Sequence, residues 1–198
     1  MSDLGDTADE RADDIPSSTR FRFLVSVPDM GDANFDQTVI FMIEHNDSGA
    51  LGIVVNRPSA TDVAEHLPDL TTSVISPPVF FVGGPVAVGG LLALGRRAID
   101  SDDEHLTPLT GPLALVDPEA LIEGAVGGLD SVRVFTGYAG WGSGQLEAEL
   151  ASGAWFVVEA ATDDVLCPEP GNLWRTIMRR QGGRLASLSL YPDDPSVN

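Results

Sequence analysis

The stretch TVIFMIEHNDSGALGIVVN, residues 38–56, decides the fold class of this chain. Its two outer parts, residues 38–44 and 50–56, are rich in β-branched and apolar side chains and are typical of strands. The residues between them, 45–49, are polar, favour turns and end in glycine, which is typical of a hairpin loop. The sequence therefore predicts a β-hairpin with a five-residue connection.

Strands outnumber helices on both sides of this hairpin. Alternating side chains predict a strand over residues 21–27, and apolar runs predict further strands at 78–82, 90–94, 111–116, 132–135 and 154–159. Capping residues, among them Asp117 and Asn172, and glycines predict helices at 118–126, 145–151 and 173–181, and a weaker one at 61–67. Because the strands follow one another and do not alternate with helices, the predicted class is α+β.

The composition predicts one folded domain with a tail. The chain has 198 residues, of which 43% are hydrophobic, and this is enough to bury a core. Residues 1–19 hold six acids, one arginine and few apolar side chains, so we expect a disordered acidic tail there. Residues 20–198 are predicted to form a single domain. The only cysteine, Cys167, excludes an internal disulfide.

The charge of the chain restricts its partners. Thirty acids against 11 bases, all of them arginine, give a formal charge of −19. A surface this acidic repels phosphate backbones, so we expect no direct binding of duplex DNA. No apolar run approaches the length of about 18 residues that a membrane helix needs, and the N-terminus lacks the basic residues of a signal peptide. We therefore expect a cytoplasmic protein without a membrane segment.

The sequence contains no standard catalytic or cofactor motif. Residues 84–89 have the glycine spacing of a phosphate-binding loop, but Gly90 and Leu91 stand where a lysine and a hydroxyl are required. Residues 140–145 match neither the dinucleotide fingerprint nor the nucleophile elbow. We predict no cofactor, no metal and no catalytic residue, and whether the protein is an enzyme stays open, with the balance against it.

Two short segments could nevertheless contribute to a binding site. Glu44 beside His45 could perform acid–base chemistry or hold a metal, but turn formation explains most of that segment, and this interpretation is favoured. Gly83 and Gly84 could free backbone N–H groups for an anion, whereas a tight turn between strands is the favoured interpretation.

The most unusual segment is GYAGWGSGQLE, residues 137–147. As a binding element it would be a flexible wall in which Tyr138 and Trp141 offer stacking surfaces, next to a helix N-terminus at Gln145. As a structural element it would cross a crowded corner with its aromatic side chains in the core, which we favour slightly.

A basic cluster stands out from the acidic background. Arg175, Arg179, Arg180 and Arg184 lie within ten residues of one another. They could bind a phosphate, an RNA or an acidic partner, but pairing with the chain's own carboxylates is the favoured interpretation. Cys167 is interpreted as a small buried residue or an idle thiol.

Several short motifs occur in a fixed order over roughly residues 20–198. They are Pro28-Asp29-Met30 with Asp32 and Phe35, Glu44-His45-Asn46, Gly49-Ala50-Leu51-Gly52, Asn56-Arg57-Pro58, Gly83-Gly84-Pro85-Val86, Gly137-Tyr138-Ala139-Gly140-Trp141, Gly144-Gln145-Leu146-Glu147, Leu173-Trp174 and Pro195-Ser196-Val197-Asn198. In this order they resemble the motifs of the YqgE/AlgH family. The family pattern has leucine and histidine after the glycine-proline segment, where this chain has Leu94-Gly95, and the pattern does not include the acidic tail.

The resemblance implies a strand-rich α+β domain whose bifurcated, mostly antiparallel sheet folds into a pseudo-barrel with a few flanking helices. Members of the family are bacterial, cytosolic and largely uncharacterised, and some are labelled transcriptional regulators because of an association with exopolysaccharide control. The family has no agreed catalytic residues, so the resemblance transfers none to this chain.

Three functions follow as hypotheses, in order of preference. The first is a cytosolic regulatory protein that binds another protein and affects transcription only indirectly, since helix-turn-helix spacing is absent. The second is a small-molecule-binding protein or enzyme, whose pocket would form if the candidate segments converge. Its candidate residues are Glu44, His45, Asn56, Gly83, Gly84, Tyr138, Trp141 and Gln145. The third is nucleic-acid or nucleotide binding through the arginine cluster at 175–184.

Overall fold

The computed structural model describes residues 16, 18–28, 36–70 and 73–190. Three sequence predictions lie mostly or wholly outside the described residues: the acidic tail over 1–19, the family motif over 28–35 and the family motif over 195–198. Within the predicted tail, Thr19 is described and is fully buried.

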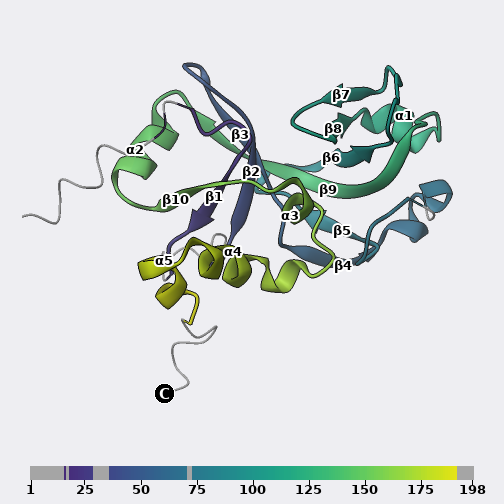
Figure 1. Ribbon diagram of the computed structural model, residues 1–198. Coiled ribbons are helices and arrows are strands. Elements are labelled where there is room, and N and C mark those ends of the chain that lie inside the picture. The colour runs from purple at the N-terminus through teal and green to yellow at the C-terminus, as the bar shows by residue number, and fades with distance from the viewer. Residues whose placement is uncertain (1–15, 17, 29–35, 71–72, 191–198) are drawn as a thin grey trace, which may run out of the picture.

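The described residues form a curved sheet that branches at one strand (Figure 1). Its strands are β1 (Arg22–Ser26), β2 (Val39–Asn46), β3 (Gly49–Val54), β4 (Pro58–Asp62), β5 (Val79–Val82), β6 (Val86–Arg97), β7 (Leu106–Pro108), β8 (Leu113–Val116), β9 (Leu129–Gly142) and β10 (Trp155–Glu159). The main order is β10-β1-β2-β3-β9-β6-β8-β7, and β5 pairs with both β4 and β9. The sheet is mostly antiparallel and forms a half-barrel, which confirms the predicted α+β fold class.

Short helices flank the sheet: α1 (Pro118–Ile122), α2 (Gln145–Ala151), α3 (Thr162–Val165), α4 (Leu173–Gln181) and α5 (Gly183–Leu188), with the single 3-10 turns η2 (Val63–Glu65), η3 (Pro68–Leu70) and η4 (Pro170–Asn172). The predicted bounds of α2 and α4 are confirmed. The predicted cap of α1 is also confirmed, because Asp117 accepts a hydrogen bond from the N–H of Glu119 at 2.9 Å. Within the described ranges, no helix is long and apolar enough to cross a membrane.

Three local helix predictions were wrong. Residues 61–67, predicted as a helix, contain the end of β4 and η2, because Asp62 ends the strand and caps the turn with its side chain. The helix α1 ends before Gly124, whose φ of +67° breaks it, and does not extend to residue 126. Asn172, predicted to cap α4, makes no capping hydrogen bond, since it is already part of η4.

The β2–β3 hairpin is confirmed, but its connection is shorter than predicted. The two strands pair as far as Asn46 and Gly49, so the turn consists of Asp47 and Ser48 alone. Oδ1 of Asn46 accepts the N–H of Ser48 at 2.9 Å, and the φ of +137° at Gly49 lets the chain reverse so tightly. The predicted five-residue loop is therefore wrong, because its polar residues His45 and Asn46 belong to the strand.

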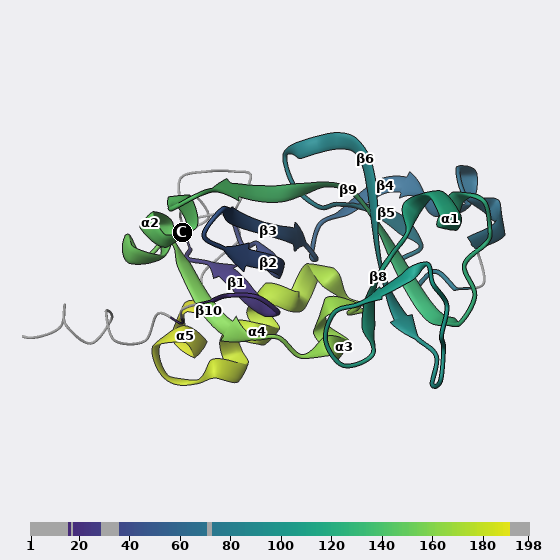
Figure 2. The same cartoon turned by 90° about the horizontal axis from the view of Figure 1, so that it is seen from above.

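Strand β9 links the two halves of the molecule. Its 14 residues pair with β3 at one end and with β6 and β5 at the other. In Figure 2 it extends from α2 on the left to the half that contains α1 on the right. The sequence predicted a strand only over 132–135, because the glycines that follow resemble a loop.

Apolar side chains are buried on both faces of the sheet. One face includes Phe41 and packs against α4 through Trp174, below β1 and β2 in Figure 1. The opposite face of the same strands includes Ile40 and packs against α2 through Leu146. A third cluster, which includes Val132, joins the other half of β9 to α1 and η2.

Candidate functional site

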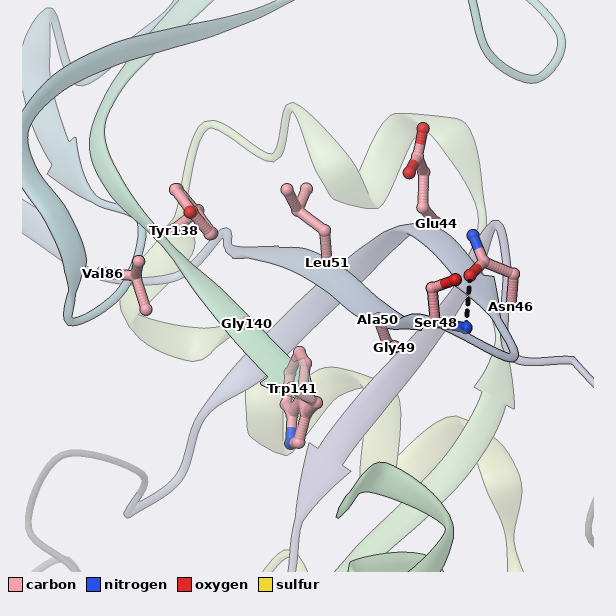
Figure 3. A pocket seen from close by; sticks show the side chains of 10 residues that line it. All are labelled: Glu44, Asn46, Ser48, Gly49, Ala50, Leu51, Val86, Tyr138, Gly140 and Trp141. Carbon is pink, nitrogen blue, oxygen red and sulfur yellow. Dashed lines mark hydrogen bonds between the residues drawn. The ribbon is translucent and has the colours of Figure 1, made fainter. Parts of the chain in front are cut away.

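An open groove of about 400 Å³ lies on the sheet beside the β2–β3 hairpin (Figure 3). It is lined by Glu44, Asn46, Ser48, Gly49, Ala50, Leu51, Val86, Tyr138, Gly140 and Trp141. The glycine-rich run at 137–142 forms one wall, and it is a strand rather than the flexible wall that the binding interpretation of this segment described. This run is the end of β9, where Ala139 to Gly142 pair with β3.

Strand pairing decides which side chains face the groove. Glu44 pairs with Leu51, and Leu51 pairs with Gly140, so these three residues form one row on the same face. Gly140 forms the floor, because a Cβ built there would lie 3.2 Å from the ring of Tyr138. The tyrosine ring therefore leans over β9 toward Gly140.

The two ends of the groove differ in chemistry. At the hairpin end, the exposed carboxylate of Glu44 forms no ion pair with another described residue. At the other end, Tyr138 is half-buried, Val86 is 37% exposed and the nearby Val88 is 67% exposed. The groove therefore offers an anion at one end and an aromatic and aliphatic surface at the other.

His45 lies on the other face of β2 and does not line the groove. The backbone N–H of Thr19 donates to its Nδ1 at 3.0 Å, and its Nε2 lies 2.9 Å from Oε1 of Glu147 on α2. Because Nδ1 accepts a backbone N–H, the neutral ring carries its proton on Nε2 and donates it to Glu147. This hydrogen bond is the main reason that the pKa of Glu147 lies below its ordinary value.

Thr19, His45 and Glu147 have the connectivity of a catalytic triad, because Oγ1 of Thr19 also lies 3.0 Å from the imidazole. Their exposure is the reverse of what catalysis requires. Thr19 is fully buried, whereas the side chain of Glu147 is 53% exposed. A substrate cannot reach the hydroxyl, so these residues instead anchor the N-terminal segment to the hairpin and to α2.

Trp141 borders the groove, but its indole is buried on the opposite face of β9 and is only 7% exposed. In Figure 3 it projects away from Leu51. Its N–H donates to Oε2 of Glu149 at 2.9 Å, and the N–H of Trp155 donates to the same oxygen at 2.8 Å. The indole therefore fastens α2 to the sheet and offers a ligand no stacking surface.

Gly83 and Gly84 form a close backbone crossing. The N–H of Gly83 donates to the carbonyl of Thr136 at 2.8 Å, and its carbonyl accepts the N–H of Val54 at 2.9 Å. A Cβ at Gly84 would lie 2.2 Å from the carbonyl carbon of Tyr138. These glycines let two strands approach each other, and the N–H of Gly83 is not free to bind an anion.

Asn56 and Gln145 also make internal contacts. Oδ1 of Asn56 accepts the N–H of Val39 at 2.9 Å, and its Nδ2 donates to the carbonyl of Gln37 at 2.9 Å. Oε1 of Gln145 accepts the N–H of Gly142 at 3.2 Å, at the start of α2. Both side chains therefore stabilise the local fold.

The candidate segments converge only in part. The groove includes Glu44, Tyr138 and Trp141 among the predicted residues, whereas it does not include His45, Asn56, Gly83, Gly84 and Gln145. The sequence analysis missed the lining residues Asn46, Ser48, Leu51 and Val86. Alternation along the hairpin strands could have indicated Leu51, but Val86 reaches the groove through an irregular pairing of β6 with β9. In the part of the chain that is described, no cluster of His, Cys, Asp or Glu could hold a metal ion.

Two residues of the arginine cluster, Arg175 and Arg180, donate hydrogen bonds to other parts of the chain. Arg180 donates to both carboxylate oxygens of Asp164, at 2.6 and 3.0 Å, and this pairing raises the pKa of the guanidinium. Arg175 donates to a backbone carbonyl beyond α5 at 2.8 Å. The predicted pairing with the chain's own carboxylates is thus confirmed for Arg180, while Arg179 and Arg184 are exposed.

Sequence comparison connects the chain to a single family. The AlgH-like family model matches residues 23–186. A UPF0301 protein of Streptomyces avermitilis is 43% identical over 186 residues, which are 92% of this chain and 96% of that protein. A UPF0301 protein of Thermobifida fusca is 41% identical and covers 88% of this chain and 93% of its own length.

Two solved structures share the fold. The crystal structure of a protein from Corynebacterium diphtheriae gives a TM-score of 0.80 at 30% identity, covering 89% of this chain and 94% of that one. The solution structure of the AlgH protein from Pseudomonas aeruginosa gives a TM-score of 0.66 at 31% identity, covering 91% and 97%. On the match of the family model and the identity of these relatives, the chain belongs to the AlgH-like family.

Proposed function

We propose that this chain is a regulatory interaction protein whose groove binds a basic and partly apolar segment of a partner protein. The observation that carries the proposal is the combination of the Glu44 carboxylate, which forms no ion pair with another described residue, with the exposed apolar rim around Tyr138 and Val86. Interfaces commonly combine such aromatic and aliphatic surface with a few charged contacts at the rim.

The charge of the chain supports a basic partner. A formal charge of −19 attracts a basic segment over distance and increases its rate of association. At the groove, Glu44 accepts charged hydrogen bonds from an arginine or lysine. The ring of Tyr138 and the side chain of Leu51 then cover the aliphatic part of that side chain or its apolar neighbour.

In this proposal the chain is cytoplasmic and its role is regulatory, in line with the resemblance to the YqgE/AlgH family. Any effect on transcription is indirect, because the acidic surface disfavours duplex DNA. The alternatives have less support. His45 and Trp141, which a ligand pocket was expected to use, make internal contacts, and Arg175 and Arg180 of the arginine cluster donate hydrogen bonds within the chain.

A selection from a library of random short peptides, with the full chain as bait, tests the proposal. We expect the recovered peptides to share an arginine or lysine beside an aliphatic or aromatic residue. Their dissociation constants, measured by titration calorimetry, should rise roughly fivefold or more for Glu44→Gln and for Tyr138→Ala, because each substitution removes an interaction of about 1–3 kcal/mol.

The matched control is Glu123→Gln, because Glu123 is an exposed carboxylate at the end of α1 and does not line the groove. Peptides that bind Glu44→Gln as weakly as expected should bind Glu123→Gln like the unsubstituted chain. Equal affinity for the two glutamine variants would contradict the proposal, and so would recovered peptides that do not depend on Tyr138.

A further inference from the structure

The charged end of the groove stands on a floor made largely of glycine. Asn46 pairs with Gly49, and Gly49 pairs with Gly142, so these residues form a second row on the groove face of the sheet. This row lies beside the one that ends at Gly140. Gly140 and Gly142 are exposed, and a Cβ built at Gly142 would meet no atom within 4 Å. Three neighbouring positions on β3 and β9 therefore present backbone alone to the groove.

The floor is flat and small. Neighbouring strands lie about 4.8 Å apart, and residues two positions apart on a strand are separated by about 6.6 Å, so the three glycines span about one such cell of the sheet. Figure 3 shows Glu44, Leu51 and Tyr138 projecting from the same side of the sheet. The floor therefore has room for one small planar group between taller side chains.

The floor offers the faces of peptide groups and not their donors or acceptors. Strand β3 is hydrogen-bonded to β2 on one side and to β9 on the other, so its N–H and C=O groups are directed within the plane of the sheet. A group that rests on the glycines must accordingly have weakly hydrated faces and carry its hydrogen-bonding atoms at its edge.

The guanidinium of arginine has these properties. It is planar and weakly hydrated, and its N–H groups lie in one plane, where they match the two oxygens of a carboxylate. Glu44 lies in the next row on β2, diagonal to Gly49, so its carboxylate stands at the edge of the floor. The ammonium of lysine is a compact, strongly hydrated point charge without a flat face, and it gains nothing from a flat floor.

We propose that the glycine floor makes the groove selective for arginine over lysine. The guanidinium lies flat on Gly49 and Gly142, and Glu44 accepts two parallel hydrogen bonds from its edge. This inference rests on the proposed function, because it specifies which basic residue of the partner segment the groove recognises. The glycines are specificity-determining positions, since any side chain there lifts the guanidinium out of the plane in which Glu44 meets it.

Three peptides tested on the full chain separate the two proposals: acetyl-Leu-Arg-Leu-amide, its lysine analogue and its citrulline analogue. Lysine keeps the charge and loses the plane, whereas citrulline keeps the plane and loses the charge. Titrations followed by the NMR shift of the Gly140 amide give the three dissociation constants. We expect the arginine peptide to bind on the order of fivefold more tightly than either analogue, because each analogue loses one charged hydrogen bond or its alignment.

The two proposals fail differently in this experiment. Equal affinity for the arginine and lysine peptides, with citrulline weaker than both, would overturn the selectivity and leave the proposed function intact. Citrulline binding as tightly as arginine would show that the charge of Glu44 is not used, and so would contradict the proposed function and this inference together. Absence of binding by all three peptides would also overturn both.

Gly142→Ala tests the floor itself. The added methyl group enters open space and the φ of Gly142 is not in the left-handed region, so the variant folds. We expect it to weaken the arginine peptide on the order of fivefold and to leave the lysine peptide nearly unchanged. Gly171→Ala is the matched control, because Gly171 is exposed in η4, has equally open space and does not line the groove. A preference for arginine that Gly142→Ala retains would overturn the inference.

Discussion

The two faces of the sheet at the end of the β2–β3 hairpin use neighbouring residues for opposite purposes. On the closed face, His45 and Trp141 contact α2, and their polar atoms are satisfied inside the protein. On the open face, Glu44 and Gly140 line the groove. Because side chains alternate along a strand, adjacent residues in one motif have unrelated roles. Several of the chemically most capable residues here, His45 and Trp141 among them, stabilise the fold, whereas most of the groove is lined by small or apolar residues.

The largest expected difference between the faces is in stability. Trp141→Ala should lower the free energy of unfolding by about 3–5 kcal/mol, because it removes a buried indole and leaves a cavity under α2. Tyr138→Ala, on the open face, should cost about 1 kcal/mol or less, since that ring is half-exposed. Urea denaturation of both variants measures the difference. Similar losses would mean that the open face is as much a part of the core as the closed one.

The next largest loss of stability is expected from a substitution at the backbone crossing of Gly83 and Gly84. Gly84→Ala should destabilise the chain by about 2–4 kcal/mol, because the added Cβ would overlap the backbone at Tyr138, which cannot rotate away. Gly89→Ala is the control, since a Cβ at Gly89 meets no atom within 4 Å. Thermal unfolding of the two variants tests this. A stable Gly84→Ala protein would show that the two strands can separate.

A smaller loss of stability is expected when the carboxylate that accepts hydrogen bonds from both indoles is removed. Glu149→Ala leaves the buried N–H groups of Trp141 and Trp155 without this acceptor, which should cost about 1–3 kcal/mol. Glu147→Ala, on the same helix, removes a contact of a half-exposed carboxylate and should cost less. The two variants are compared in urea at neutral pH, and the reverse order would contradict the assignment of Glu149 as the link between α2 and the sheet.

The smallest expected effect depends on pH. The hydrogen bond from His45 lowers the pKa of Glu147, so this contact stabilises the fold above the ordinary value of 4.5 and is lost as the pH falls through the lower, folded value. The contribution should be below about 1 kcal/mol, because the carboxylate is 53% exposed and screened by solvent. The stability difference between the unsubstituted chain and Glu147→Gln should therefore narrow in acid. If this difference in the free energy of unfolding stayed constant from neutral pH to below 4, the contribution assigned to the His45–Glu147 contact would be contradicted.

Local signals predicted much of the fold and little of the site. The hairpin, the cap at Asp117 and the bounds of α4 follow from a few consecutive residues each. The glycine-rich end of β9 resembled a loop, because the close contact of Gly137 with the crossing at Gly83 and Gly84 joins residues more than 50 positions apart. The link between His45 and Glu147 spans 102 residues. Contacts between residues so far apart in the sequence depend on tertiary packing, which a short motif does not predict.

The sequence predicted only those lining residues whose side chains stand out chemically. Glu44 and Tyr138 were identified for their chemistry and do line the groove. Leu51 was missed because an apolar strand residue resembles any core residue, and Val86 was missed because its pairing partner Tyr138 is set by a register shift in β6. The sequence predicted which side chains are chemically capable, but it did not predict which face of the sheet each of them occupies.

The three pairings of β9 restrict where residues can be inserted or deleted in this chain during evolution. A single residue inserted or deleted between the part of β9 that pairs with β5 and β6 and the part that pairs with β3 would put the two parts out of register with each other. Such a slip would turn Trp141 toward solvent and place a glycine under α2. The segment 87–90 is different, because it leaves the ladder between two pairing points of β6 and is exposed. Changes in length should therefore accumulate in that segment, next to the groove, where they alter what the groove can bind without altering the fold.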